Sequence, residues 1–429
     1  MLAAEPPRLG LPEAGGKRDA AVRVALIAAA IGSFSSPPLT NVAAALALVL
    51  ALASAPMRSR LVDVARQPLG RCALALFAVM ALAMLWAGVP WSARFAAWWN
   101  WRTMLLIVLA AAAFGDARWK ERFGLSLVVS VTLAAIASWG MWAAHVTLEP
   151  PFAGTLLRNH VTQSMALAVA VLIAVVLAAQ RGRSVRARWL LAGAALVCLA
   201  NLVAVTAGRS GQIALAVAAV SAALLMLTGR RRWQAVLALL ALAAGLAAAS
   251  PALQQRFRLV AQEASAVDCD SPAENSTAIR LLLWRTTGAL IRAHPWLGYG
   301  VGGFTPAYGE EVRRQVHEQP LTGWCARPAH DPHNQYLRVT VEAGALGLIA
   351  FLGLLAGAAR QPAAQPHRSC ALALLAAWCV TSLFSSHFQT FNEAHLIALL
   401  LGVLLAPEAY SGKAQPAARA ANTAERTSP

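Results

Sequence analysis

The chain has 429 residues, of which 58% are hydrophobic and only 13% are charged. This composition is far from the average of soluble globular proteins. The apolar residues form blocks close to the roughly 20 residues that a helix needs to cross a bilayer core, so the sequence predicts an all-α polytopic membrane protein. The net charge of +17 does not indicate nucleic acid as a partner, because the basic residues lie in short segments between apolar blocks.

About twelve membrane-spanning helices are expected in chain order. They cover residues 21–34, 38–55, 72–89, 98–114, 123–146, 161–179, 189–207, 212–227, 233–249, 336–355, 370–385 and 395–406. The first is short and is a candidate for one half of a helical hairpin with the second. The residues before it are polar and no small-residue cleavage pattern follows, so we expect the first helix to serve as an uncleaved anchor.

Lys and Arg are concentrated in alternate connections between these helices. One set of connections contains Arg58, Arg60, Arg66, Arg71, Arg118, Lys120, Arg122, Arg181, Arg183, Arg186, Arg188, Arg230, Arg231, Arg232, Arg360 and Arg368. The short connections of the other set contain Arg94, Arg158 and Arg209, with Arg102 near a boundary. Because cytoplasmic loops carry the excess of Lys and Arg, both termini are predicted inside and the long segment from Ser250 to His333 outside.

This topology divides the chain into five parts. They are a cytoplasmic tail (1–20), nine helices (21–249), an outer loop with candidate active-site residues and amphipathic helices (250–335), three helices (336–406) and a disordered cytoplasmic tail (407–429).

Arginines and histidines on the predicted outer side are the candidate functional residues. Arg209 lies among small residues, in Gly208-Arg209-Ser210-Gly211, which leaves its guanidinium accessible to a ligand. Arginine binds phosphate in a bidentate fork and stays charged beside a bilayer, although an arginine at a helix end also commonly extends to lipid headgroups. Arg158 also lies at the outer end of a predicted helix.

The outer loop itself contains two further patterns. Arg280 to Ala293, which includes Arg285, reads as an amphipathic helix that ends before Pro295 and a glycine-rich turn without the sequence of a Walker loop. His330-Asp331-Pro332-His333 precedes an apolar run, and histidine titrates near neutrality and can act as a general base. A structural role for these histidines stays open, and no third metal ligand is evident.

Acidic and cysteine residues of the outer loop are ambiguous. Asp268-Cys269-Asp270 has the Asp-x-Asp form of metal-binding glycosyltransferases, but no nucleotide-binding fold surrounds it, and a three-residue pattern arises easily by chance. An oxidising compartment permits a disulfide between Cys269 and Cys325, and the sequence leaves open whether they are bridged.

His333-Asn334, nine residues and then Gly344-Ala-Leu-Gly347 resembles the signature of bacterial O-antigen ligases. Arg280, Trp284, His294-Pro295, Gly298, Gly300 and Phe304 are similar to the same superfamily, which includes O-antigen polymerases and protein O-oligosaccharyltransferases. The resemblance implies a GT-C-like membrane enzyme of the bacterial inner membrane with a periplasmic active site, and it extends to the twelve-helix layout and the long outer loop.

The resemblance also implies a reaction. A polysaccharide on undecaprenyl pyrophosphate would be transferred to the lipid A-core oligosaccharide by metal-independent, inverting glycosyl transfer, with no cofactor. His333 would be the base, with His330 as the alternative, and Arg209, Arg280, Arg158 and Arg285 would bind the pyrophosphate. A secondary transporter is the alternative of another class; it is disfavoured because the predicted spans contain few charges and the two halves differ.

Overall fold

The computed structural model describes residues 16–206, 208–249, 269, 276–318 and 323–408. This part of the chain is helical and contains no β-strand. Its helices are α1 (Lys17–Ser35), α2 (Pro37–Leu52), α3 (Ala55–Ala65), α4 (Pro68–Leu82), α5 (Trp91–Trp99), η1 (Asn100–Arg102), α6 (Thr103–Ala113), α7 (Ala117–Ala143), α8 (His160–Ala178), α9 (Val185–Ala204), α10 (Arg209–Met226), α11 (Gly229–Ala249), α13 (Ser276–Ala293), α14 (Phe304–Glu318), η2 (Gly323–Ala326), α15 (Gln335–Arg360), α16 (His367–Thr381) and α17 (Phe391–Leu404).

A helix lies in each of the twelve apolar segments, but not all of these helices are long and apolar enough to cross a membrane. Within the described residues, six segments are: Trp91–Ala113, Ala117–Ala143, His160–Ala178, Val185–Ala204, Arg209–Met226 and Gln335–Arg360. A seventh would be α2 with α3, which are bent by 104° at their junction. The all-helical membrane class is therefore supported, and the number of twelve spans remains a prediction.

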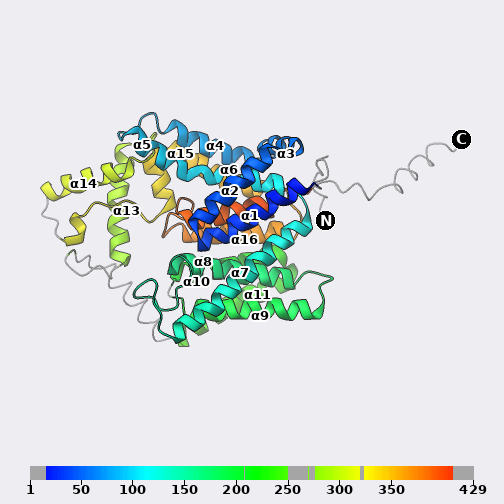
Figure 1. Cartoon of the computed structure of the whole chain (residues 1–429). Coiled ribbons are helices and arrows are strands. Elements are labelled where there is room, and N and C mark those ends of the chain that lie inside the picture. The colour runs from blue at the N-terminus through cyan, green and yellow to red at the C-terminus, as the bar shows by residue number, and fades with distance from the viewer. Residues whose placement is uncertain (1–15, 207, 250–268, 270–275, 319–322, 409–429) are drawn as a thin grey trace.

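The helices run between two ends of the molecule (Figure 1). At one end, which we call the α13 end, α13 and α14 lie beside the start of α15. At the opposite end, which we call the tail end, Lys120 donates to the carbonyl of Ala406 and Arg60 pairs with Asp19 at 2.5 Å. The start of α7 thus meets the end of α17, and the start of α1 meets α3.

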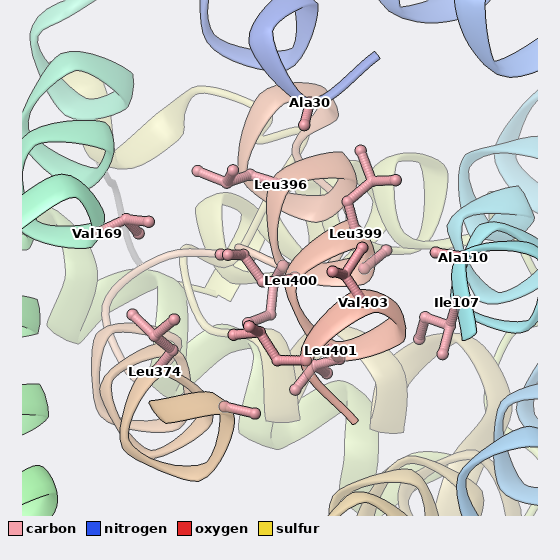
Figure 2. Packing of buried hydrophobic residues seen from close by; sticks show 14 of the residues in the cluster. Ala30, Ile107, Ala110, Val169, Leu374, Leu396, Leu399, Leu400, Leu401 and Val403 are labelled. Atoms are coloured by element: carbon pink, nitrogen blue, oxygen red, sulfur yellow. The ribbon is translucent and has the colours of Figure 1, made fainter. Parts of the chain in front are cut away.

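A short helix at the centre explains much of the packing. From Leu396 onward α17 is apolar on every face, and its residues from Asn392 to Leu404 are all buried. Side chains of α1, α6, α8 and α16 surround it (Figure 2). With 14 residues it is about 21 Å long, which is less than the thickness of a bilayer core. A helix that is apolar all round is enclosed by other protein segments. Because α17 does not face lipid, its length need not match the thickness of the bilayer core.

Several features differ from the sequence-based picture or go beyond it. α1 and α2 pack as a hairpin around Ser36, as expected. The basic connection after α2 is not a plain loop, because it forms α3, in which Arg60 is buried against Asp19. The tryptophan-rich segment forms α5, which continues through η1 into α6. The expected disorder of both tails concerns residues that, apart from a few next to the helices, lie outside the described part of the chain.

Candidate functional site

α15 is broken at the glycine that opens the Gly-x-x-Gly part of the motif. Ala343 (φ −131°, ψ 16°) and Gly344 (φ 61°, ψ −157°) leave the helical region, and the helix then resumes. Positive φ is readily adopted by glycine and is strained for residues with a Cβ. A break inside an apolar helix also frees backbone groups that must find new partners, because an unpaired buried N–H or C=O is costly.

The turn after α13 supplies those partners. The amide of Tyr299 donates to the Val341 carbonyl at 2.8 Å, and the amide of Ala345 donates to the Pro295 carbonyl at 2.8 Å. The two backbone segments can approach closely because each has a glycine at the crossing. A Cβ on Gly344 would overlap the Trp296 carbonyl. The glycine-rich turn therefore has a specific role beyond connecting two helices, since it closes the break in α15.

His333 lies just before α15, on an unusual backbone. Its φ is 50°, in the left-handed region, and its side chain is 50% exposed. Its Nδ1 lies 3.6 Å from Oδ2 of Asp331, while the Ser386 hydroxyl donates to Oδ1 of the same carboxylate at 2.6 Å. The ring is thus directed by Asp331, and Asp331 is held by the connection between α16 and α17.

The asparagine of the motif fixes the start of α15. Oδ1 of Asn334 accepts from the amides of Tyr336 and Leu337 at 3.0 and 3.1 Å, which is the usual role of an N-cap side chain. Its amide donates to the Leu383 carbonyl at 3.1 Å. His333 is therefore followed by a residue that is anchored to two elements.

His330 is exposed and less firmly placed. Its Nδ1 lies 3.5 Å from the Thr305 hydroxyl, at the limit of a hydrogen bond. Its carbonyl accepts from Arg338 at 2.6 Å. Arg338 also pairs at 2.9 Å with Glu342, which is fully buried, so a charged pair at i,i+4 supports this segment.

The sequence reasoning missed this pair. Two opposite charges four residues apart within an apolar run were the available signal.

Arg209 is the first residue of α10, and its side chain is exposed. The glycines on either side press α10 against α8: a Cβ on Gly208 or on Gly211 would overlap Ser164, and the Gly211 amide donates to the Ser164 hydroxyl at 3.1 Å. The small residues serve close helix packing, and Arg209 emerges at a helix N-terminus, where the backbone favours anions.

Arg280 and Arg285 both belong to α13, whose expected amphipathic helix is confirmed. Burial lowers the pKa of Arg280, and the charge of Arg209 lowers it further. Arg285 is exposed. The indole of Trp284 donates to the Pro332 carbonyl at 3.1 Å, which attaches α13 directly to the residue before His333.

Arg158 lies elsewhere on the α13 end, on the wall of a cavity of about 570 Å³. Arg209, Arg280 and His333 do not line it. The wall consists of Pro37, Arg158, Asn159, Val161, Ser385, His387, Thr390, Phe391, Asn392 and Glu393. The sequence reasoning missed His387 and Glu393, although polar residues at 387, 392, 393 and 395 beside an apolar run were a signal.

Cys269 and Cys325 form a disulfide, which decides the question that the sequence left open. Asp268 and Asp270 lie outside the described residues. Among the residues that are described, no three His, Cys, Asp or Glu side chains are grouped as a metal ion would require.

The arrangement combines two chemical capacities at the α13 end. His333, with a carboxylate 3.6 Å away, can accept a proton and be stabilised as an imidazolium. Arg209 and Arg280 concentrate positive charge beside the N-terminus of α10 and can neutralise a polyanion.

Comparison with known protein families gives a match to the segment that contains these residues. A curated protein of Rickettsia conorii, which carries the provisional name of a polysaccharide ligase, is 35% identical over 80 residues. The match covers 19% of this chain and 19% of that protein, so it spans about a fifth of the relative's length. Residues 194–352, which include Arg209, Arg280, His333 and the glycine motif, match the family model described as O-antigen ligase. The resemblance carried by His333 and the two glycines is thereby confirmed over this segment, which is similar to the O-antigen ligase family and makes up less than half of the chain.

Proposed function

We propose that this protein is an O-antigen ligase of the bacterial inner membrane, with the tail end in the cytoplasm and the α13 end in the periplasm. The donor is a polysaccharide on undecaprenyl pyrophosphate, and the acceptor is a sugar hydroxyl of the lipid A-core oligosaccharide. The family match supports the class of reaction, and the concentration of Arg and Lys in connections at the tail end supports the orientation.

His333 removes the proton from the acceptor hydroxyl as that oxygen attacks the anomeric carbon from the face opposite the leaving group. The carbon–oxygen bond to pyrophosphate breaks, and the lipid pyrophosphate leaves with the electron pair. Attack from the opposite face inverts the anomeric centre. Asp331 stabilises the imidazolium that forms, as a carboxylate beside a basic histidine does in other enzymes.

Arg209 and Arg280 bind the pyrophosphate and offset the charge that develops on it, with Arg285 in a supporting role. Arg158 lines a separate cavity and is not assigned to the pyrophosphate. Two guanidinium groups close to a helix N-terminus are suited to this task. Pyrophosphate is already a competent leaving group, so fixed positive charge can take the place of a metal ion.

The observation that carries the proposal is the link between the two groups of residues. α13 carries Arg280, whose environment includes Arg209, and the same helix holds the Pro332 carbonyl through Trp284. Residues that are far apart in the sequence are thereby joined at one end of the molecule, where a lipid-linked donor and a hydroxyl acceptor can meet.

Transfer by the purified protein from a defined lipid-linked polysaccharide tests the proposal. Lipid A-core, a peptide with Ser and Thr, and a second lipid-linked polysaccharide are offered separately. Product on lipid A-core alone is expected; product on the polysaccharide or the peptide would instead identify a polymerase or a protein O-oligosaccharyltransferase. Arg280→Lys and Arg209→Lys are expected to lower kcat/KM at least tenfold, because lysine cannot form the bidentate contact.

A further inference from the structure

Buried polar atoms without partners surround the cavity that contains Arg158. His387 is 1% exposed, and both of its ring nitrogens lack a hydrogen-bond partner within the described residues. The Thr390 hydroxyl is also buried and unpartnered there. Both residues line the cavity. The three atoms have almost no accessible surface and cost free energy while they are unsatisfied, so a group that enters the cavity would recover that cost once the two side chains turn towards it.

The remaining wall identifies the chemistry of that group. Glu393 is buried and offers acceptor oxygens, of which one receives the Thr162 hydroxyl at 2.7 Å. Asn159 and Asn392 add amide groups, and the ring of Phe391 adds a flat apolar surface. A phosphate would meet the Glu393 carboxylate at close range, which is unfavourable. Sugar hydroxyls both donate and accept, and a sugar ring also has an apolar face, so a saccharide fits all of these groups.

The cavity is joined to the proposed base by three consecutive residues. Ser385 and His387 belong to its wall, and between them Ser386 donates to Asp331, the carboxylate beside His333. Burial lowers the pKa of His387, while the carboxylates of Glu393 and Asp331 act in the opposite direction. The wall of the cavity is therefore adjacent in the chain to the contact that holds Asp331.

We propose that this cavity is the binding site for the terminal sugar of the acceptor, recognised by Glu393, His387 and Thr390. The proposal rests on the proposed function, because it assigns the acceptor side of the same reaction. Arg209 and Arg280 lie outside the cavity and serve the donor. A sugar held here is next to the segment that fixes Asp331, so its hydroxyl can be delivered towards His333.

Direct binding tests this assignment without any transfer reaction. The probe is core oligosaccharide released by mild acid from the lipopolysaccharide of a strain that lacks this gene, titrated calorimetrically into the purified full-length protein. Thr390→Val and Glu393→Gln are expected to weaken binding at least tenfold, the scale of losing hydrogen bonds in a buried site. Gly353→Ala, where a Cβ meets nothing within 4 Å, is expected to bind the oligosaccharide as the unaltered protein does.

Thr390→Val also separates binding from folding. Valine has nearly the shape of threonine and removes an unpartnered hydroxyl, so the melting temperature is expected to stay the same or rise while binding falls. In steady-state transfer, both variants should raise the KM for lipid A-core and leave the KM for the donor within about twofold.

Two results would overturn the assignment. One is oligosaccharide binding that is unchanged in both Thr390→Val and Glu393→Gln. The other is displacement of the oligosaccharide by inorganic pyrophosphate, which would identify the cavity as an anion site. An absence of transfer to lipid A-core, with binding intact and sensitive to both variants, would contradict only the proposed function.

Discussion

The left-handed backbone of His333 has a physical cost. A residue with a Cβ at φ 50° is strained by on the order of 1 kcal/mol or more, and such positions persist where surrounding contacts enforce them. Here the enforcing contacts are the Asn334 cap on one side and the Trp284 bond to the Pro332 carbonyl on the other. This backbone conformation places the imidazole beside Asp331 and leaves half of the side chain exposed to a substrate.

His333 and His330 are expected to respond differently to the same substitution. His333→Gln should lower kcat by about 10²–10⁴, the usual contribution of a general base, because glutamine cannot take up the proton. His330→Gln should retain activity within about fivefold, since the ring of His330 contacts the Thr305 hydroxyl rather than a carboxylate that would stabilise an imidazolium. Rates are measured with purified protein at equal concentration.

Membrane levels and melting temperatures of both variants serve as controls for folding. A larger loss of kcat in His330→Gln than in His333→Gln would assign the base to His330 instead.

At the scale of elements, the break in α15 and the turn after α13 form one unit. The motif glycine has no chemical role in this arrangement; it allows two backbones to cross, and the freed amide of Ala345 is satisfied across that crossing. Two motifs that are separated by more than forty residues in the sequence therefore depend on the same crossing of two backbone segments.

A pair of glycines in α15 tests the importance of the break. Gly344→Ala should destabilise the protein by about 1–3 kcal/mol through strain at positive φ, and overlap with the Trp296 carbonyl adds to this. Gly353→Ala is the matched control, because a Cβ there meets nothing within 4 Å and alanine favours a helix.

Melting in detergent is measured for both variants, together with transfer activity. Equal melting temperatures for the two variants would contradict the role assigned to Gly344.

The sequence predicted the helices well because apolar runs of this length have few alternatives to a helix. It placed α13 correctly from its amphipathic pattern and its proline stop. It did not predict the break in α15, because glycine inside an apolar run also occurs in continuous helices. It also missed His387 and Glu393 as cavity residues, since their neighbourhood arises from α2, α8 and α17 meeting, which only tertiary packing determines.

Considered as a whole, the molecule has its polar chemistry at both ends and an apolar centre. The tail end contains buried charges that are paired or bonded to backbone, such as Arg60 with Asp19 and Lys120 with the Ala406 carbonyl. The α13 end contains the proposed site and the Cys269–Cys325 bridge. Because the two ends differ in this way, the contribution of the disulfide and the orientation of the protein in the membrane can each be tested.

Removal of the bridge is expected to lower stability. In the chain-entropy model, a closed segment with a sequence separation of 56 contributes on the order of 4 kcal/mol. Cys269→Ala with Cys325→Ala should therefore lower the melting temperature, and a reducing agent should do the same to the unaltered protein. Cys72→Ala, at an unbridged and partly buried cysteine, is the control. An unchanged melting temperature in the double variant would show that this region adds little to global stability.

The proposed orientation is tested with single reporter cysteines in a background where the four free cysteines are alanine. Glu310→Cys on α14 should react in intact cells with a maleimide that reaches the periplasm but not the cytoplasm, because this exposed position lies at the α13 end. Ser184→Cys, exposed between α8 and α9 at the tail end, should react only after lysis. The reverse pattern would invert the proposed topology.

The crossing at Gly344 also has a consequence for how this sequence can vary. It is made by backbone atoms, so it places no demand on the side chains of Trp296 and Leu297, which are 75% and 51% exposed. Gly298 and Gly344, by contrast, have no room for any other residue. Among relatives that keep this crossing, the two glycines should be nearly fixed, while the residues at positions 296 and 297 vary with the lipid or partner surface that each protein faces.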